Sequence, residues 1–120
     1  MERRRAYRVA WDHPIACRKV VGDARERVTL QARAVDVSTD GLLLATSRPL
    51  RPGDRVQLHL QSEEPLLDVH ALALVVRDAG TADGLFRSGA RFARMAELQR
   101  SELAGFIAEQ ALRSGVPVLH

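Results

Sequence analysis

The stretch that decides the fold runs from Arg27 to Ala45 and reads RVTLQARAVDVSTDGLLLA. Over residues 27–37 apolar and polar side chains alternate, and the apolar face holds Val28, Leu30, Ala32 and Ala34. This period of two predicts a half-buried strand. The pair Asp40-Gly41 separates it from the apolar run 42–45, and we expect the glycine to supply the positive φ of a tight turn. The stretch therefore predicts an antiparallel hairpin.

Strand patterns continue on both sides of this hairpin. The further predicted strands are Pro14–Val21, a segment through Val56, Leu58 and Leu60, then Leu67–Val76 and Leu85–Phe92. Residues 71–76 are apolar on both faces, so another element should cover their outer side. Residues 78–84 read as a polar turn, and Gly89 predicts a bulge or a close approach.

The period becomes helical between Glu97 and Arg113. The predicted apolar stripe consists of Leu98, Leu103, Phe106, Ile107 and Ala111. Gly115 and Pro117 predict the end of the helix. Six strands with tight turns and one amphipathic helix predict a mainly β fold, a six-stranded antiparallel β-barrel with a C-terminal α-helix. Closure removes the edge strands, and we expect the helix to cover the strand that is apolar on both faces.

The length of 120 residues fits one hydrophobic core and is too short for two. We expect a single domain over residues 1–120, with a flexible arginine arm at 1–9, a barrel at 10–93 and a helix at 97–113.

Apolar residues make up 46% of the chain and charged residues 28%, as in ordinary globular proteins. The sequence has no apolar run long enough to span a membrane and no signal peptide, and its one cysteine is Cys17. These features predict a cytoplasmic protein without membrane insertion.

The positive charge is concentrated at the N-terminus. Residues 1–8 carry four arginines and one glutamate, a net charge of +3 that equals the charge of the whole chain. A guanidinium is a planar fork of donors that keeps its charge, so Arg3, Arg4, Arg5 and Arg8 suit phosphates or a guanine edge. A broad nucleic-acid face needs basic residues spread over an element, so we expect no DNA or RNA partner. Alone, a basic terminus is more often a solvated tail.

A second polar motif, DVSTDG at 36–41, follows the strand 27–37. Asp36 and Ser38 lie two residues apart, so an acceptor and a hydroxyl point from one rim of the hairpin. Taken alone, such side chains commonly cap their own backbone. Combined with the arm, they predict a ligand with phosphates for the arginines and hydrogen-bond donors for the carboxylate. A guanine nucleotide carries both.

No catalytic or metal site is predicted. The histidines are scattered at His13, His59, His70 and His120, whereas a metal needs clustered ligands. Ser38 has no histidine at a useful spacing, Cys17 has the pattern of a buried strand residue, and no phosphate-binding glycine loop precedes a helix. We expect a non-enzymatic binder without a cofactor.

The two motifs resemble those of the PilZ domain, the bacterial cyclic di-GMP receptor. Residues 4–8 (RRAYR) match RxxxR, and residues 36–41 match [D/N]xSxxG, in the order found in that family. The stretch SGARF at 88–92 also resembles the G-x-x-F strand that closes the family's barrel. The resemblance covers nearly the whole chain.

The resemblance implies a cyclic di-GMP receptor or adaptor without enzymatic activity. It assigns Arg4 and Arg8 to the guanine edge and phosphates, and Asp36 to the guanine N1 and N2 hydrogens. Ser38 would add a hydrogen bond, and Gly41 would keep the turn tight. In the family an arginine at the position of Arg3 accompanies two intercalated ligand molecules, which favours a stacked pair. Arg5, Arg77 and Arg91 are candidates for outer-shell contacts.

The arm is expected to act as a switch. Ordering eight residues costs about 1–2 kcal/mol each, on the order of 10 kcal/mol in total, whereas one charge-assisted hydrogen bond returns about 1.5–3 kcal/mol. A ligand with two phosphates and two guanines could order the arm where a single phosphate could not. We expect this change to signal to an unidentified protein partner, from a monomeric receptor. Two alternatives stay open, a protein-interaction module and a non-specific nucleic-acid binder that uses the basic arm.

Overall fold

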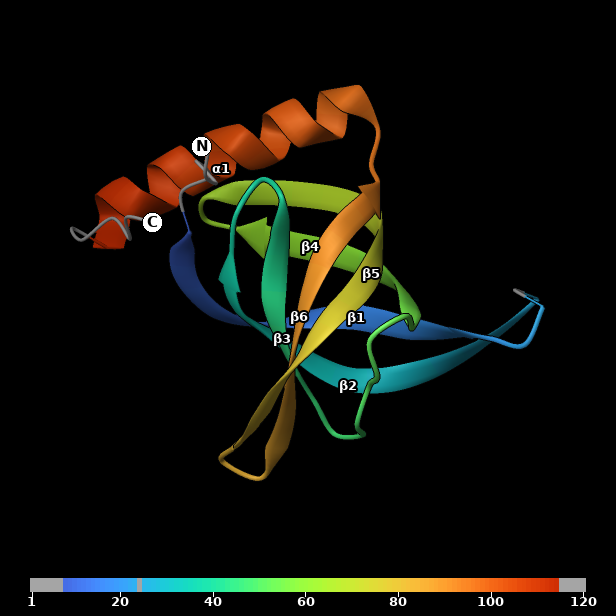
Figure 1. Ribbon diagram of the computed structural model, residues 1–120. Coiled ribbons are helices and arrows are strands. Elements are labelled where there is room, and N and C mark those ends of the chain that lie inside the picture. The colour runs from blue at the N-terminus through green and yellow to red at the C-terminus, as the bar shows by residue number, and fades with distance from the viewer. Residues whose placement is uncertain (1–7, 24, 115–120) are drawn as a thin grey trace, which may run out of the picture.

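The computed structural model describes residues 8–23 and 25–114. Within these ranges the chain forms a closed antiparallel barrel with the strand order β1-β2-β3-β6-β5-β4 and one helix (Figure 1). The elements are β1 (Val9–Val21), β2 (Glu26–Val37), β3 (Gly41–Thr46), β4 (Arg55–Glu63), β5 (Leu66–Ala82), β6 (Leu85–Arg94) and α1 (Glu97–Ser114). The predicted fold class is confirmed. In this part of the chain, no helix has the length and apolar character needed to cross a membrane.

Alternating side chains fill the interior of the barrel. Val56, Leu58 and Leu60 of β4 are buried, and their cross-strand partners in β5 are buried as well. Fully burying one such side chain stabilises the fold by about 1.5–3 kcal/mol, so this ladder is a major part of the core. The alternation predicted for residues 27–37 fails at Val28, which is 44% exposed. β2 pairs with β3 only from Ala32 onward, so Val28 lies where the β1–β2 hairpin has left the barrel.

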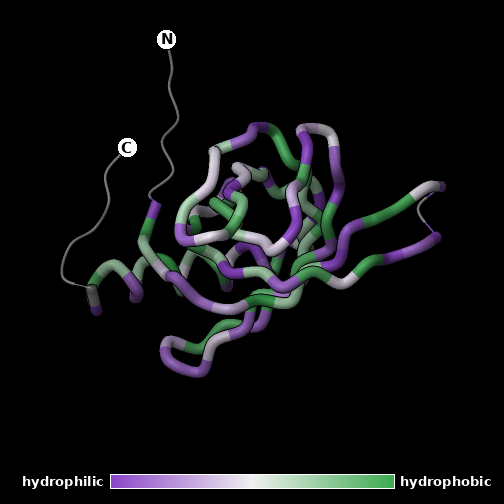
Figure 2. The backbone as a smooth tube through the Cα atoms, turned by 90° about the horizontal axis from the view of Figure 1, so that it is seen from below, coloured by the Kyte–Doolittle hydropathy of each residue, from purple (hydrophilic) through white to green (hydrophobic). Residues whose placement is uncertain are grey.

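Two strands are longer than the sequence pattern predicts. β1 begins at Val9 instead of Pro14, and β5 continues to Ala82, so the predicted turn at 78–84 shrinks to its last residues. The added part of β5 belongs to a β5–β6 hairpin that projects from the barrel, as does the far end of the β1–β2 hairpin (Figures 1 and 2). Both faces of such a hairpin meet solvent, so its sequence does not alternate. In β1 the register shifts between Ala10 and His13, which also breaks the period.

The helix α1 lies across one end of the barrel (Figure 1). Leu103, Phe106 and Ile107 are buried there, and the rings of Phe106 and of Trp11 in β1 pack at an interplanar angle of 66° with centroids 5.1 Å apart. Leu98, which was assigned to the apolar stripe, is 84% exposed. The predicted end of the helix at Gly115 and Pro117 lies outside the described residues. Ala111 is partly buried against the same core, so the helix closes the barrel end through four of the five predicted apolar residues.

The helix also provides hydrogen-bond acceptors for the part of β5 that does not pair with β6. β6 pairs with β5 only from Leu72 onward. Just before this point, Glu102 and Gln99 of α1 accept hydrogen bonds from the backbone N–H groups of Asp68 and His70, at 3.0 and 2.7 Å. Val76 keeps 45% of its surface exposed. The expectation that the helix covers the outer side of residues 71–76 is therefore wrong for this residue.

Candidate functional site

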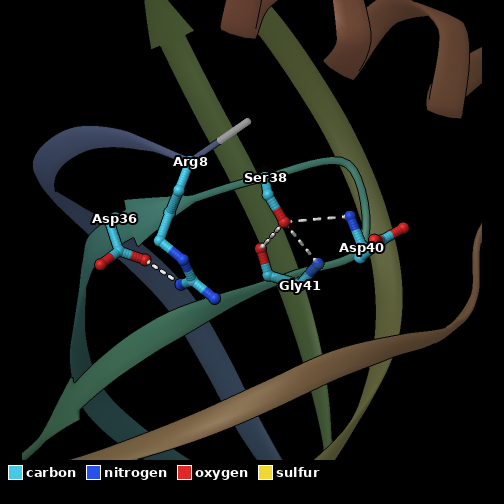
Figure 3. A network of polar contacts seen from close by, with 5 residues as sticks. All are labelled: Arg8, Asp36, Ser38, Asp40 and Gly41. Carbon is cyan, nitrogen blue, oxygen red and sulfur yellow. Dashed lines mark hydrogen bonds and ion pairs between the residues drawn. The ribbon is translucent and has the colours of Figure 1, made fainter. Parts of the chain in front are cut away.

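The turn between β2 and β3 is held by Ser38, whose side chain is buried. The Ser38 hydroxyl accepts hydrogen bonds from the N–H groups of Asp40 and Gly41, at 3.1 and 3.2 Å, and donates to the Gly41 carbonyl at 3.3 Å (Figure 3). The backbone N–H of Ser38 donates to the same carbonyl at 2.8 Å. This hydroxyl therefore fixes the shape of the turn, and its contact with a ligand stays a prediction.

Gly41 is required by the approach of two strands. A Cβ atom at this position would lie 2.1 Å from the carbonyl oxygen of Ala90 and 2.9 Å from the Cα atom of Arg91, both in β6. The expectation that Gly41 supplies a positive φ is wrong, because within residues 8–23 and 25–114 the glycines with a positive φ are Gly22, Gly53, Gly80 and Gly84. Gly41 thus lets β3 and β6 close the barrel beside the Ser38 turn.

Arg8 and Asp36 meet at the start of β1 and the end of β2. The register pairs Ala10 with Asp36 and Val9 with Val37, which brings the preceding Arg8 to the same rim. Arg8 Nη1 donates to Asp36 Oδ1 at 2.6 Å, and the two side chains are 38% and 22% exposed. In Figure 3 the Arg8 side chain extends between Asp36 and the Ser38 turn. The arginine motif and the acidic turn therefore share one site.

A cavity of about 160 Å³ lies beside this pair. Its lining residues are Arg8, Ser38, Asp40, Gly41, Leu42, Val76, Arg77, Gly89, Ala90 and Arg91. The structure thus brings together five of the site residues that the sequence predicts, and Asp36 joins them through Arg8. The other three, Arg3, Arg4 and Arg5, lie outside the described residues.

Gly89 makes room for one of the cavity arginines. Arg77 and Gly89 are cross-strand partners, and a Cβ atom at Gly89 would lie 2.9 Å from Arg77 Nε. The close approach predicted at Gly89 is confirmed. Among residues 8–23 and 25–114, no acidic side chain forms an ion pair with Arg77 or Arg91. Their guanidiniums leave the cavity positively charged and open to an anion.

Two further contacts hold the turn from outside. Arg100 of α1 donates from Nη1 to the carbonyl oxygen of Thr39 at 3.0 Å, and the N–H of Phe92 in β6 donates to the carbonyl of Asp40 at 2.8 Å. Asp40 also lines the cavity, although its carboxylate points away from Arg8 (Figure 3). Sequence analysis missed Arg100, because an arginine on a helix face has the same pattern whether it meets solvent or a turn.

Comparisons with known proteins match most of the chain to a single domain family. The sequence matches the family model described as the PilZ domain over residues 2–109. The inhibitor of motility MotI/DgrA of Bacillus subtilis is similar with a TM-score of 0.67 and 15% identity, covering 94% of this chain and 53% of that one. This chain thus spans about half the length of that protein. The PilZ domain of YcgR from Escherichia coli, in a structure with c-di-GMP, gives a TM-score of 0.63 and 19% identity, covering 94% and 95%. No curated protein matches the chain.

Proposed function

The chain belongs to the PilZ domain family of non-enzymatic cyclic di-GMP receptors, and we propose that it binds cyclic di-GMP at the cavity beside Arg8 and Asp36. The observation that carries the proposal is the 2.6 Å pair between these two side chains, because it joins the arginine motif to the acidic turn. The YcgR PilZ domain, whose structure was determined with c-di-GMP, has the same fold.

The ligand would exchange contacts with the Arg8–Asp36 pair. Both side chains are partly exposed, and a surface ion pair contributes only about 0–1 kcal/mol. The Asp36 carboxylate can accept the N1 and N2 hydrogens of a guanine, and Arg8 can donate to the guanine O6 and N7 or to a phosphate. Each charge-assisted hydrogen bond contributes about 1.5–3 kcal/mol, so opening the pair for the ligand is favourable.

The cavity is too small to enclose the dinucleotide. Pockets that enclose a drug-sized ligand measure about 300–1,000 Å³, whereas this one measures about 160 Å³. One guanine edge would enter it, and the phosphates would lie on the rim near Arg77 and Arg91. We assign the remaining phosphate contacts to Arg3 and Arg4 and propose a stacked pair of ligands, with Arg5 as an outer contact.

Binding would also change the surface that another protein meets. The ligand draws residues 1–7 of the predicted arm toward the rim, where Arg8 already lies, and neutralises the arginines of the arm. Because Arg100 joins the turn to α1, the ligand acts on the helix as well. We propose that a protein partner reads this change, with the receptor acting as a cytoplasmic monomer.

Calorimetric titration of the full chain with cyclic di-GMP tests the proposal. We expect two ligands per chain, and we expect Arg8→Ala and Asp36→Ala each to weaken binding at least about 10-fold, equivalent to about 1.4 kcal/mol. Arg33→Ala is the matched control, because Arg33 forms a comparable pair with Asp12 at 2.9 Å away from the cavity. No heat at tens of micromolar ligand would contradict the function, and unchanged affinity in both variants would contradict the site.

The switch is tested separately by hydrogen exchange. We expect the backbone amides of residues 1–7 to exchange more slowly when cyclic di-GMP is bound. Unchanged exchange at saturating ligand would contradict the switch while leaving the binding site intact. Binding of single-stranded DNA with a steep salt dependence and no guanine preference would instead favour the non-specific nucleic-acid binder.

A further inference from the structure

Two histidines that are eleven positions apart in the sequence face each other on the outside of the barrel. His59 of β4 and His70 of β5 are direct cross-strand partners, and their rings stack with centroids 4.0 Å apart. The core neighbours Leu58, Leu60 and Val69 point inward, which leaves both imidazoles on the outer face. The expectation that the histidines are scattered and do not cluster is therefore wrong for this pair.

A carboxylate completes the group. Asp68 lies two residues before His70 on the same face of β5, and its Oδ1 atom is 2.6 Å from Nε2 of His59. One ligand atom from each of His59, Asp68 and His70 lies within 4.8 Å of the other two. Tetrahedral zinc, with bonds of about 2.0–2.1 Å, keeps its ligand atoms about 3.3 Å apart. A bound ion would bring these atoms to that spacing through rotation of the side chains about their χ angles.

Two imidazoles and one carboxylate are ligands that divalent transition ions prefer. Imidazole suits zinc, copper and nickel, and a three-ligand set leaves positions open for water or another ligand. Both histidines line a cavity of about 580 Å³ that also contains Arg18 and Arg94. These two cations oppose a bare metal ion, and the single negative charge of Asp68 offsets part of that repulsion.

We propose that His59, His70 and Asp68 bind one divalent transition ion, with zinc as the natural probe. The ion would take the place of the proton between His59 and Asp68 and would tie β4 to β5. This site is independent of the proposed function, because its cavity shares no lining residue with the cavity at Arg8.

The ion would also stabilise the contact between α1 and β5. The backbone N–H groups of Asp68 and His70 are the groups that Glu102 and Gln99 accept from. Because an ion that binds only the folded chain stabilises it, bound zinc should raise the midpoint of thermal unfolding by several degrees.

Titration of the tag-free, metal-stripped full chain with zinc chloride tests the site. We expect one ion per chain with a dissociation constant in the micromolar range. His59→Gln and His70→Gln keep the polar character of the surface and should each weaken binding at least about 10-fold, and Asp68→Asn should weaken it as well. His13→Gln is the matched control, because His13 stacks on Trp11 and is not a member of the group.

A spectroscopic readout separates this site from binding elsewhere. Cobalt in place of zinc should give visible absorption bands in the unaltered chain and in the His13→Gln and Arg8→Ala variants, and the bands should be lost in His59→Gln. Circular dichroism of the metal-free variants checks that each is folded. The proposal is overturned if the unaltered chain binds no zinc at millimolar concentration, or if folded His59→Gln and His70→Gln bind it with unchanged affinity.

Discussion

At the scale of single residues, the site depends on two glycines that leave space for their neighbours. Gly41 lets the β3 backbone touch β6 at Ala90, and Gly89 lets the Arg77 side chain lie across its backbone. Neither role follows from backbone freedom, because the requirement is the absence of a Cβ atom. The sequence marks these positions as glycines in a strand context, but only the barrel register shows what would collide with them.

Gly41→Ala should destabilise the fold and weaken ligand binding together. The added carbon would lie 2.1 Å from a backbone oxygen, so strand atoms must shift, at a cost of about 1–3 kcal/mol. Urea denaturation measures the loss. Gly105→Ala is the control, because a Cβ atom there meets nothing within 4 Å in a helix, and it should stabilise the protein by about 0.5–1 kcal/mol. Equal stability of the two variants would contradict this steric account.

At the scale of elements, the sequence pattern predicts the strand segments that have one face in the core and misses those that project into solvent. The β4 alternation of Val56, Leu58 and Leu60 predicts its strand because burial on one side imposes a period of two. The outer part of β5, with Asp78 and Gly80, has no buried face and therefore no period. Contacts between distant elements, such as Arg100 with Thr39 across 61 positions, leave no local pattern at all.

Arg100→Ala should loosen the binding turn from the helix. The variant loses one charge-assisted hydrogen bond to the Thr39 carbonyl, so we expect the free energy of unfolding to fall by about 1.5–3 kcal/mol. Amide exchange at residues 38–41 should become faster. Arg113→Ala, which removes only long ion pairs of 3.7 and 3.8 Å at the other end of α1, should change stability by less than about 1 kcal/mol. Unchanged exchange in Arg100→Ala would contradict the proposed link.

At the scale of the whole molecule, the closed barrel buries the thiol of Cys17 in its hydrophobic core. Burial raises the pKa of the Cys17 thiol from 9.0 to about 11. The folded state therefore favours the neutral thiol more than the unfolded state does. The resulting contribution to stability is fully present below about pH 9 and is lost as the pH rises through about 11.

The unfolding free energy should therefore fall in alkaline solution by a term that depends on Cys17. The rise in the pKa of Cys17 from 9.0 to about 11 corresponds to about 2–3 kcal/mol of unfolding free energy. About 2 kcal/mol of this contribution should be lost at pH 11. Comparison with Cys17→Ala isolates the term, because all other groups titrate in both proteins. The stability difference between the two should shrink between about pH 8 and pH 11. A constant difference over this range would contradict the burial of an uncharged thiol.

The overall arrangement places the two sites on different parts of the barrel. The cavity at Arg8 lies at the β2–β3 turn, whereas His59, His70 and Asp68 lie on β4 and β5 beside the edge that α1 covers. The hairpin predicted over residues 27–45 was enough to place Asp36 beside the β2–β3 turn, but the position of Arg8 there follows from the early start of β1 at Val9. A ligand in the cavity at Arg8 and an ion on the β4–β5 hairpin should therefore bind without competing.

The most direct test of the central claim is a titration of the isotopically labelled chain with cyclic di-GMP, followed by amide resonances in nuclear magnetic resonance. The largest shifts should fall on Arg8, Asp36 and the turn 38–41, and next on Arg77 and Arg91. Shifts that centre on β4 and the first part of β5 instead, or no shifts at saturating ligand, would contradict the account.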